Sequence, residues 1–154
     1  MLSHHRKALF LFLSPSLLVW AQGCADQETD QAPVIVTVVE RAETDVVTDI
    51  GDPGDSVGDI LTFANPLFDA SNTTQVGTDQ GYCVRVEVGK SWECFWTAFL
   101  AEGQLTVEGP FFDAGDSVLA ITGGTDQYSN ASGQMKLHFR NPQGTEFDFT
   151  YEIE

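Results

Sequence analysis

The stretch EFDFTYEI, residues 146–153, alternates polar and apolar side chains at every position. A period of two is typical of a β-strand with one buried face. Seven further short runs are rich in β-favouring residues and are separated by Gly, Asp, Asn and Pro: 33–41, 59–64, 80–88, 91–101, 104–109, 117–122 and 132–140. No run from Pro33 onward has helical spacing. About eight strands joined by short turns predict an antiparallel sandwich or barrel, and an eight-stranded barrel can hold its own side chains or one small ligand.

One strand pairing follows from the residues 83–94, CVRVEVGKSWEC, which have the pattern of a hairpin turning at Val88 and Gly89. With paired residue numbers summing to 177, Cys83 lies opposite Cys94 and Arg85 opposite Trp92. Cysteines that face each other across two strands are close enough for a disulfide, and an oxidising compartment would favour that bond. The alternative is a pair of reduced cysteines acting as small apolar residues in the interior.

The first 23 residues have the layout of an export signal. They contain no acidic residue, start with a basic cluster and continue as an apolar run from Ala8 to Ala21 that is too short to span a bilayer comfortably. AQGC, residues 21–24, resembles a bacterial lipobox, which predicts lipidation at Cys24 and a cell-envelope lipoprotein. The alternative is ordinary signal cleavage and a periplasmic or secreted protein. Residues 24–32 are polar and acidic and are predicted to be a tether, leaving 33–154 as the domain.

The net charge of the chain limits the kinds of molecule that it can bind. The chain has 23 Asp and Glu against 7 Lys and Arg, a net charge of −16. Nucleic acid needs a basic face, so it is excluded as a partner, and membrane contact is expected only through the lipid anchor. The hydrophobic content of 42%, with 11 Phe, 3 Tyr and 3 Trp, argues for a packed core rather than a disordered acidic tail.

Common catalytic and metal-binding patterns are missing. His138 is the single histidine after the signal, and no Gly-x-Ser-x-Gly motif accompanies it. The aspartates of residues 49–59 lack EF-hand spacing. If Cys24 is lipidated and Cys83 pairs with Cys94, no thiol remains for a zinc cluster. We therefore expect neither a metal nor a cofactor, and a small apolar ligand or substrate as the partner.

Residues 56–137 resemble allene oxide cyclase and, more loosely, the dirigent proteins that share its barrel. The resemblance rests on five ordered motifs: GDILTFANPLF at 58–68, VGTDQGYCV at 76–84, VEGPF at 107–111, DSVLAITGG at 116–124 and GQMKL at 133–137. It implies an eight-stranded antiparallel barrel, a homo-oligomer (trimer or dimer), and an isomerase or cyclase. Such a protein folds an unstable fatty-acid allene oxide in an apolar tunnel so that ring closure gives one stereoisomer.

Matched motif by motif, the resemblance places the family's asparagine, which holds a water near the epoxide oxygen, on Asn65. A separate segment, VVERAETD at 38–45, is similar to the family strand with the pattern Glu-x-x-Glu-x-Asp, and it places the family's charge-delocalising glutamate on Glu40. The family's cavity cysteine falls on Cys83. The family's second asparagine is Ala42 here. Other interpretations of the same residues are a surface carboxylate at Glu40 and a turn-forming residue at Asn65, which precedes Pro66.

The apolar wall and the substrate's head group have their own candidates. Phe63 and Cys83 are candidate substrate-binding residues, and Arg85, on the strand face of Cys83, is the candidate for binding a substrate carboxylate. The large aromatic residues belong either to the core or to the wall of a tunnel: Phe63, Trp92, Trp96, Phe99, Phe147 and Phe149. The alternative functions are a non-catalytic dirigent-like or lipid-binding protein, and a structural envelope lipoprotein filled by its own side chains.

Overall fold

The computed structural model describes residues 32–154, and the predicted signal, Cys24 and nearly all of the predicted tether lie outside them. Ten strands and one short 3-10 helix make up the described chain: β1 (Val34–Arg41), β2 (Val46–Thr48), β3 (Ile60–Phe63), β4 (Pro66–Asp69), β5 (Gln75–Glu87), β6 (Ser91–Leu100), β7 (Gly103–Phe112), β8 (Ser117–Gly124), η1 (Asp126–Tyr128), β9 (Gly133–Phe139) and β10 (Glu146–Ile153). No helix in this part of the chain has the length and apolar character needed to cross a membrane.

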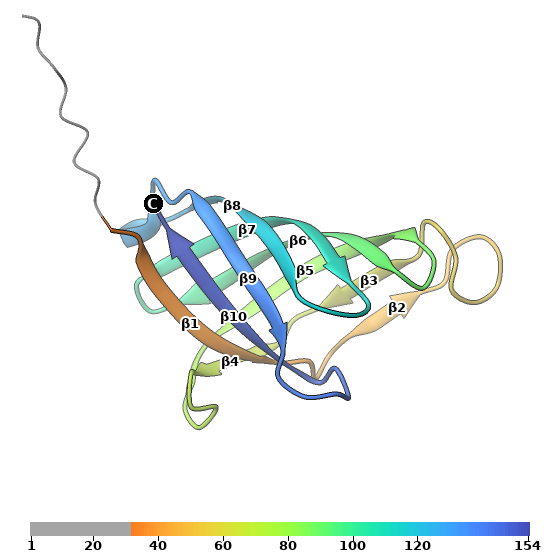
Figure 1. Ribbon diagram of the computed structural model, residues 1–154, viewed down its shortest axis with the longest axis horizontal. Helices are drawn as coiled ribbons and strands as arrows, with labels where there is room; N and C mark the ends of the chain where they lie inside the picture. The colour runs from red at the N-terminus through yellow and green to blue at the C-terminus, as the bar shows by residue number, and fades with distance from the viewer. Residues whose placement is uncertain (1–31) are drawn as a thin grey trace, which may run out of the picture. The chain divides into compact units, whose positions relative to one another are not determined.

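The strands close into an eight-stranded antiparallel barrel, as predicted (Figure 1). The sheet runs β2-β3-β5-β4-β1-β10-β9-β8-β7-β6, and pairing of β5 with β6 closes the ring. Ten strands fill eight positions because two positions hold broken strands. β3 and β4 both pair with β5, at residues 81–84 and 75–78, while β1 pairs with β4 and β2 with β3. Closure leaves the ladder with no long free edge.

The two breaks lie side by side and are the main departure from the predicted strands. Neither β2 nor β4 was predicted, because three and four residues are too few to show a period. The strand predicted at 80–88 begins at Gln75 instead, since pairing with β4 and β6 holds a Gly- and Asp-containing segment extended. At the breaks, Ala64 N donates to Thr44 Oγ1 at 2.7 Å. This irregular part of the wall positions the candidate site.

The inward-facing side chains of the alternating strands fill the interior of the barrel. On β10, the residues Phe147, Phe149, Tyr151 and Ile153 are buried, as the pattern predicts. On β6, the inward residues are Trp92, Cys94, Trp96 and Ala98. Gly81 lies directly opposite Trp96 across the β5–β6 pair, and a Cβ at Gly81 would collide with the Trp96 backbone and Cβ. A glycine is therefore required at this position, where the main chains of β5 and β6 approach each other beside Trp96.

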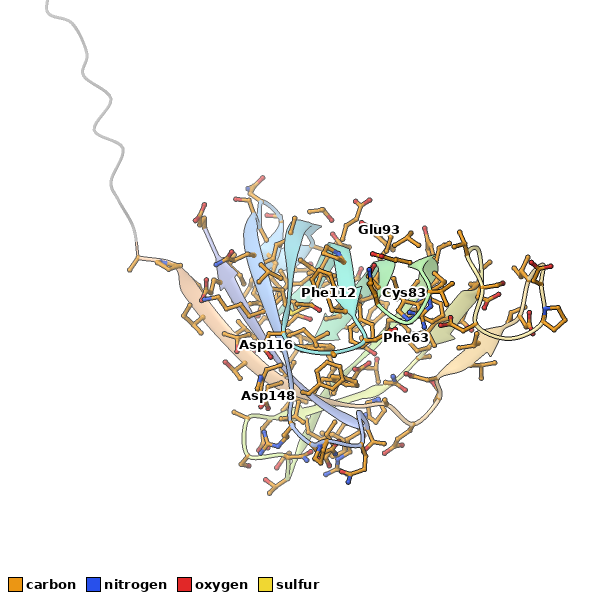
Figure 2. The ribbon with its side chains drawn as sticks, turned by 45° about the vertical axis from the view of Figure 1, so that its right-hand side comes forward. Phe63, Cys83, Glu93, Phe112, Asp116 and Asp148 are labelled. Carbon is orange, nitrogen blue, oxygen red and sulfur yellow. A yellow bond between two sulfur atoms is a disulfide. The ribbon has the colours of Figure 1, made fainter. Side chains whose placement is uncertain are left out.

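The β5–β6 hairpin has the predicted register. Cys83 pairs with Cys94 and Arg85 with Trp92, and the turn contains Gly89 at φ +66°. Cys83 and Cys94 form a disulfide, and both residues are buried in the interior. The neighbouring Glu93 lies on the exposed outer face (Figure 2). The disulfide thus forms part of the inner wall of the barrel.

Removing this disulfide should destabilise the protein. We expect the double variant Cys83→Ala, Cys94→Ala to lose about 3 kcal/mol of unfolding free energy, because a cross-link closing a loop of this length restricts the unfolded chain by about that amount. Chemical denaturation followed by circular dichroism measures the loss. Each single alanine variant should lose a similar amount, since either removes the bond. An unchanged denaturation midpoint would show that the disulfide contributes nothing to stability.

Candidate active site

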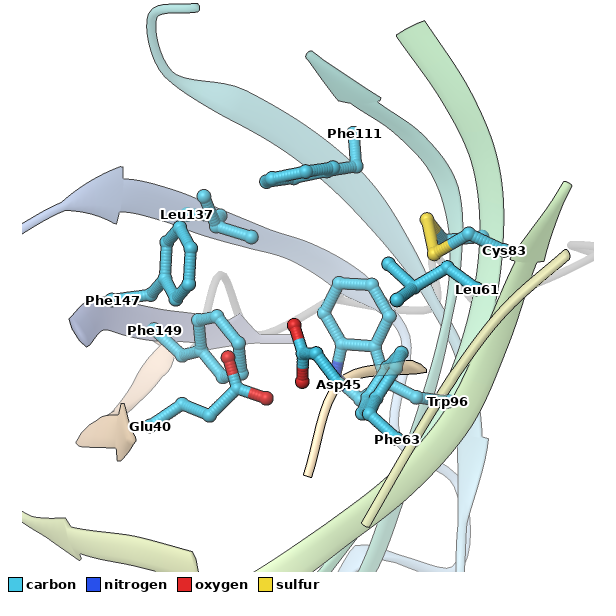
Figure 3. A pocket seen from close by; sticks show the side chains of 11 residues that line it. Glu40, Asp45, Leu61, Phe63, Cys83, Trp96, Phe111, Leu137, Phe147 and Phe149 are labelled. Carbon is cyan, nitrogen blue, oxygen red and sulfur yellow. A yellow bond between two sulfur atoms is a disulfide. The ribbon is translucent and has the colours of Figure 1, made fainter. Parts of the chain in front are cut away.

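A cavity of about 40 Å³ opens inside the barrel beside the strand breaks (Figure 3). Apolar side chains and the disulfide form most of its wall, and two carboxyl groups enter it. The lining residues are Glu40, Asp45, Leu61, Phe63, Cys83, Cys94, Trp96, Phe111, Leu137, Phe147 and Phe149. On a scale where one water needs about 10–15 Å³, the space holds about three waters. A larger ligand therefore has to displace side chains at the cavity wall.

Glu40 is the buried carboxyl of this cavity. It lies near the end of β1, opposite Phe147 on β10 and Leu67 on β4, and only 6% of the residue is exposed. Burial raises the pKa of Glu40 well above its usual range, and the negative charge of Asp79 raises it further. A carboxyl in such surroundings keeps its proton to a higher pH than an exposed carboxyl does, and it can donate that proton to a ligand atom.

Asn65 holds the carboxyl groups in place from the break between β3 and β4. Its Nδ2 donates to Glu40 Oε1 at 2.9 Å and to Asp45 Oδ1 at 2.8 Å. Its Oδ1 accepts from the backbone N–H groups of Glu43 and Thr44, at 3.0 and 2.9 Å, and from the Thr44 hydroxyl. Asn65 is 1% exposed and does not line the cavity. Because its amide is fully engaged, its geometry is that of a positioning residue for Glu40.

Asp79 was missed by the sequence reasoning. It lies on β5 behind Glu40, is 1% exposed, and accepts from Asn65 N at 3.2 Å through Oδ1. Its Oδ2 has no hydrogen-bond partner in the described part of the chain. Burial raises the pKa of Asp79 to about 7. The two carboxyls interact directly, so one proton shared between them lets one donate to the other. Counting in twos from Cys83 along β5 would have placed Asp79 inside.

Tyr151 and Trp96 complete the polar floor. The Tyr151 hydroxyl and Trp96 Nε1 are both buried, and neither makes a well-aligned hydrogen bond among residues 32–154, although the Trp96 indole lies close enough to the hydroxyl to lower its pKa in part. Burial, followed by the charge of Asp79, raises the pKa of Tyr151, which keeps the hydroxyl protonated. The alternation of residues 146–153 places Tyr151 on the apolar face of its strand but does not mark it as functional. The floor of the barrel thus combines two carboxyls, a phenol and an indole.

The other predicted residues divide into two places. Phe63 and Cys83 line the cavity, and the Phe63 ring meets the Trp96 ring edge-on at 6.0 Å between centroids. Of the other aromatic candidates, Trp96, Phe147 and Phe149 also line it, whereas Trp92 and Phe99 do not. The cysteine at the wall carries no free thiol, because it is bonded to Cys94.

Arg85 is placed away from this cavity. Its Nη1 donates to both carboxylate oxygens of Asp113, at 2.8 and 2.7 Å, and its Nε lies 2.7 Å from Asp55 Oδ1. Its guanidinium also lies 3.9 Å from the centre of the Trp92 ring. The predicted shared face with Cys83 holds, but two carboxylates from distant loops neutralise the charge. This geometry does not present Arg85 to a carboxylate in the cavity.

The raised pKa values predict that the protein loses stability as the pH rises. Asp79 binds its proton up to about pH 7 when folded but only to about 3.8 when unfolded. Its stabilising effect is therefore complete below about pH 4 and is lost as pH rises through 7. Glu40 acts in the same direction. The pKa of Asp69 is lowered to about 2, chiefly by the backbone N–H of Thr73, so Asp69 lowers the stability only as the pH falls below about 4.

We expect the free energy of unfolding to fall by on the order of 3 kcal/mol between pH 4 and pH 8. Urea denaturation at each pH measures it. The control is Asp79→Asn, which keeps the size of the side chain but cannot ionise. The difference between the two curves separates Asp79 from the general repulsion among the surface acids. Parallel curves would contradict the assignment.

The fold and the site define a class: an antiparallel barrel whose aromatic interior holds a few buried polar groups. The sequence model of the allene oxide cyclase family matches residues 26–143. The chain therefore belongs to the allene oxide cyclase family. Residues 32–154 contain no group of three or more His, Cys, Asp or Glu arranged to hold a metal ion.

Solved structures share the barrel. A structure described as pyocyanin demethylase matches with a TM-score of 0.68 and 26% identity, over 79% of this chain and 100% of that one. AbnU, described as an exo-specific intermolecular Diels-Alderase, matches at 0.61 and 17%, over 80% and 98%. The pterocarpan synthase dirigent protein PsPTS1 matches at 0.61 and 16%, over 80% and 97%. The last two likenesses show the fold alone, and that fold carries both enzymes and dirigent proteins.

Proposed function

We propose that this chain is an isomerase or cyclase of the allene oxide cyclase type, which binds an unstable apolar substrate in the barrel and directs its ring closure to one stereoisomer. The observation that carries the proposal is the Glu40 carboxyl, buried beside Asp79 in a cavity otherwise lined by apolar and aromatic groups.

The proposed mechanism needs no covalent intermediate. The walls restrict the substrate to conformers from which one face of the ring can close, which replaces a search through many conformers in solution. The Glu40–Asp79 pair holds one shared proton. A hydrogen bond from it to the substrate's epoxide or carbonyl oxygen draws electrons toward that oxygen, while the remaining negative charge stabilises the positive charge left on the carbon skeleton.

The test is to add a freshly made fatty-acid allene oxide to the full chain, both as the methyl ester and as the free acid, and to measure the chirality of the cyclopentenone formed. Enrichment of one enantiomer above the spontaneous racemic product supports the proposal. A racemic product formed at the spontaneous rate rules this substrate out. Binding of the ester without any change in rate or chirality would favour the alternative, a non-catalytic dirigent-like or lipid-binding protein.

A further inference from the structure

The ionisable side chains in and around the cavity are all acidic. Glu40 and Asp45 line it, and Asp79 lies directly behind Glu40. The Oδ2 atom of Asp79 is buried and accepts from no N–H group or hydroxyl of the described chain, so the proton shared with Glu40 is the donor available to it. In Figure 3 the Glu40 and Asp45 carboxyl groups both project into the space between the aromatic side chains. Such an arrangement lacks a positive partner.

No basic side chain of residues 32–154 lines this cavity, and each has another partner. Lys90 pairs with Glu87, Lys136 with Glu152 and Arg140 with Asp148. Arg85 is held by its two aspartates. Arg41 lies over the Phe68 ring and donates to Asn72. A positive charge in this cavity therefore has to come from outside residues 32–154, either as the proton of the carboxyl pair or as part of a ligand.

The aromatic walls suit a cation. The rings of Trp96 and Phe149 are 5.5 Å apart, and Phe111 lies 5.9 Å from Phe147. The faces of aromatic rings attract cations, most strongly where water is excluded. The acidic surface, at a net charge of −16, also raises the local concentration of cations and lowers that of anions. Walls, floor and surface thus favour the same sign of charge.

We propose that the cavity selects a flat apolar substrate that carries or acquires delocalised positive charge beside Glu40, Asp45 and Asp79, and that it rejects substrates with an anionic group. This inference rests on the proposed function and narrows its substrate class. It replaces the expectation that Arg85 binds a substrate carboxylate. A fatty-acid substrate would have to enter as a neutral ester or keep its carboxylate outside the cavity.

The release of protons on binding indicates whether a cation occupies this cavity. The titratable groups that face Glu40 and Asp79 are each other, Asp45 and Tyr151, with the Asn65 amide between the carboxyls. A bound cation favours the ionised form of a carboxyl, so it lowers the pKa of the pair and displaces its proton. Binding at this site should therefore release up to about one proton per cation near pH 7, and affinity should rise with pH. Cations bound to the outer acids would release none.

Three probes of one shape and different charge test the inference: N-methylquinolinium (positive), 1-methylnaphthalene (neutral) and 1-naphthoate (negative). We expect calorimetric titration of the full chain to show the cation bound at least tenfold more tightly than the neutral probe, with no binding of the anion. Titrations in buffers of different ionisation enthalpy count the released protons. Equal binding of the cation and the neutral probe, preference for the anion, or no binding of any probe would overturn the inference.

Single-residue variants show where on the protein the cation binds. Glu40→Gln should remove the preference for the cation and the proton release, and Asp45→Asn, which changes an exposed carboxylate, should weaken the preference without affecting the core. The matched control Glu93→Gln removes the same charge from the outer face and should change neither. A preference that survives Glu40→Gln would assign the cation to the surface and overturn the inference. A protein that fails here can still enrich one enantiomer from a neutral ester, so the two proposals fail separately.

Discussion

Replacing Glu40 with glutamine is expected to abolish the enantiomeric enrichment and to lower the rate above the spontaneous reaction by about 100-fold, the usual contribution of a general acid. Glutamine keeps the size of the side chain and an oxygen that can accept the hydrogen bond from Asn65 Nδ2. It provides neither an acidic proton nor a negative charge. Chiral chromatography of the product from the allene oxide ester, against time, measures both quantities.

The stability of this variant distinguishes chemistry from folding. Glu40→Gln removes a buried carboxyl whose ionised form is disfavoured, so its free energy of unfolding at pH 8 should equal or exceed that of the wild type. Glu93→Gln, on the exposed face of β6, should leave rate and enrichment unchanged. If Glu40→Gln folds and retains the enrichment, Glu40 has no part in the reaction.

Replacing Asn65 with alanine is expected to lower the free energy of unfolding by about 4 kcal/mol. The substitution leaves the N–H groups of Glu43 and Thr44 without their acceptor and removes the amide between Glu40 and Asp45. An unpaired polar group costs about 1–3 kcal/mol where it is buried, which applies fully to the Glu40 carboxyl and in part to the two part-buried N–H groups. Thermal or urea denaturation measures the loss. A loss of less than about 1 kcal/mol would show that the structure at the two strand breaks is stable without the hydrogen bonds of Asn65.

Asn65→Asp is the matched variant for this position. It preserves an acceptor for the two N–H groups but places a third carboxyl between Glu40 and Asp45. We expect it to be strongly destabilised at pH 8 and to regain stability toward pH 4, where the carboxyls bind protons. Stability that does not change with pH would indicate that the three groups are too far apart to interact.

Individual strands and one hairpin could be predicted where the local sequence carries its own pattern. Residues 146–153 alternate strictly, and the hairpin of Cys83 and Cys94 has one register that joins its two cysteines. The motifs at 58–68 and 116–124 indicated the family. The short strands β2 and β4 were not readable, because three or four residues become strands only through the partners they meet.

The site was readable only in part. Glu40 and Cys83, predicted from the resemblance, and Phe63, predicted as a residue of the apolar wall, line the cavity together. Asp79 was readable from the alternation but carries no motif that marks it as functional. The partners of Arg85, Asp55 and Asp113, lie 30 and 28 residues away in the chain, in loops without regular structure. A local pattern cannot contain such pairs.

Strand positions and inward faces follow from the amino-acid sequence, because backbone geometry makes neighbouring side chains point to opposite sides of a sheet. The chemistry of the cavity follows from the closed barrel. Glu40 from β1, Asp79 from β5 and Tyr151 from β10 meet only when the sheet closes on itself. Burial and the negative charge of neighbouring carboxylates then raise the pKa values of Glu40 and Asp79, and both effects depend on distance and solvent exclusion rather than on residue type.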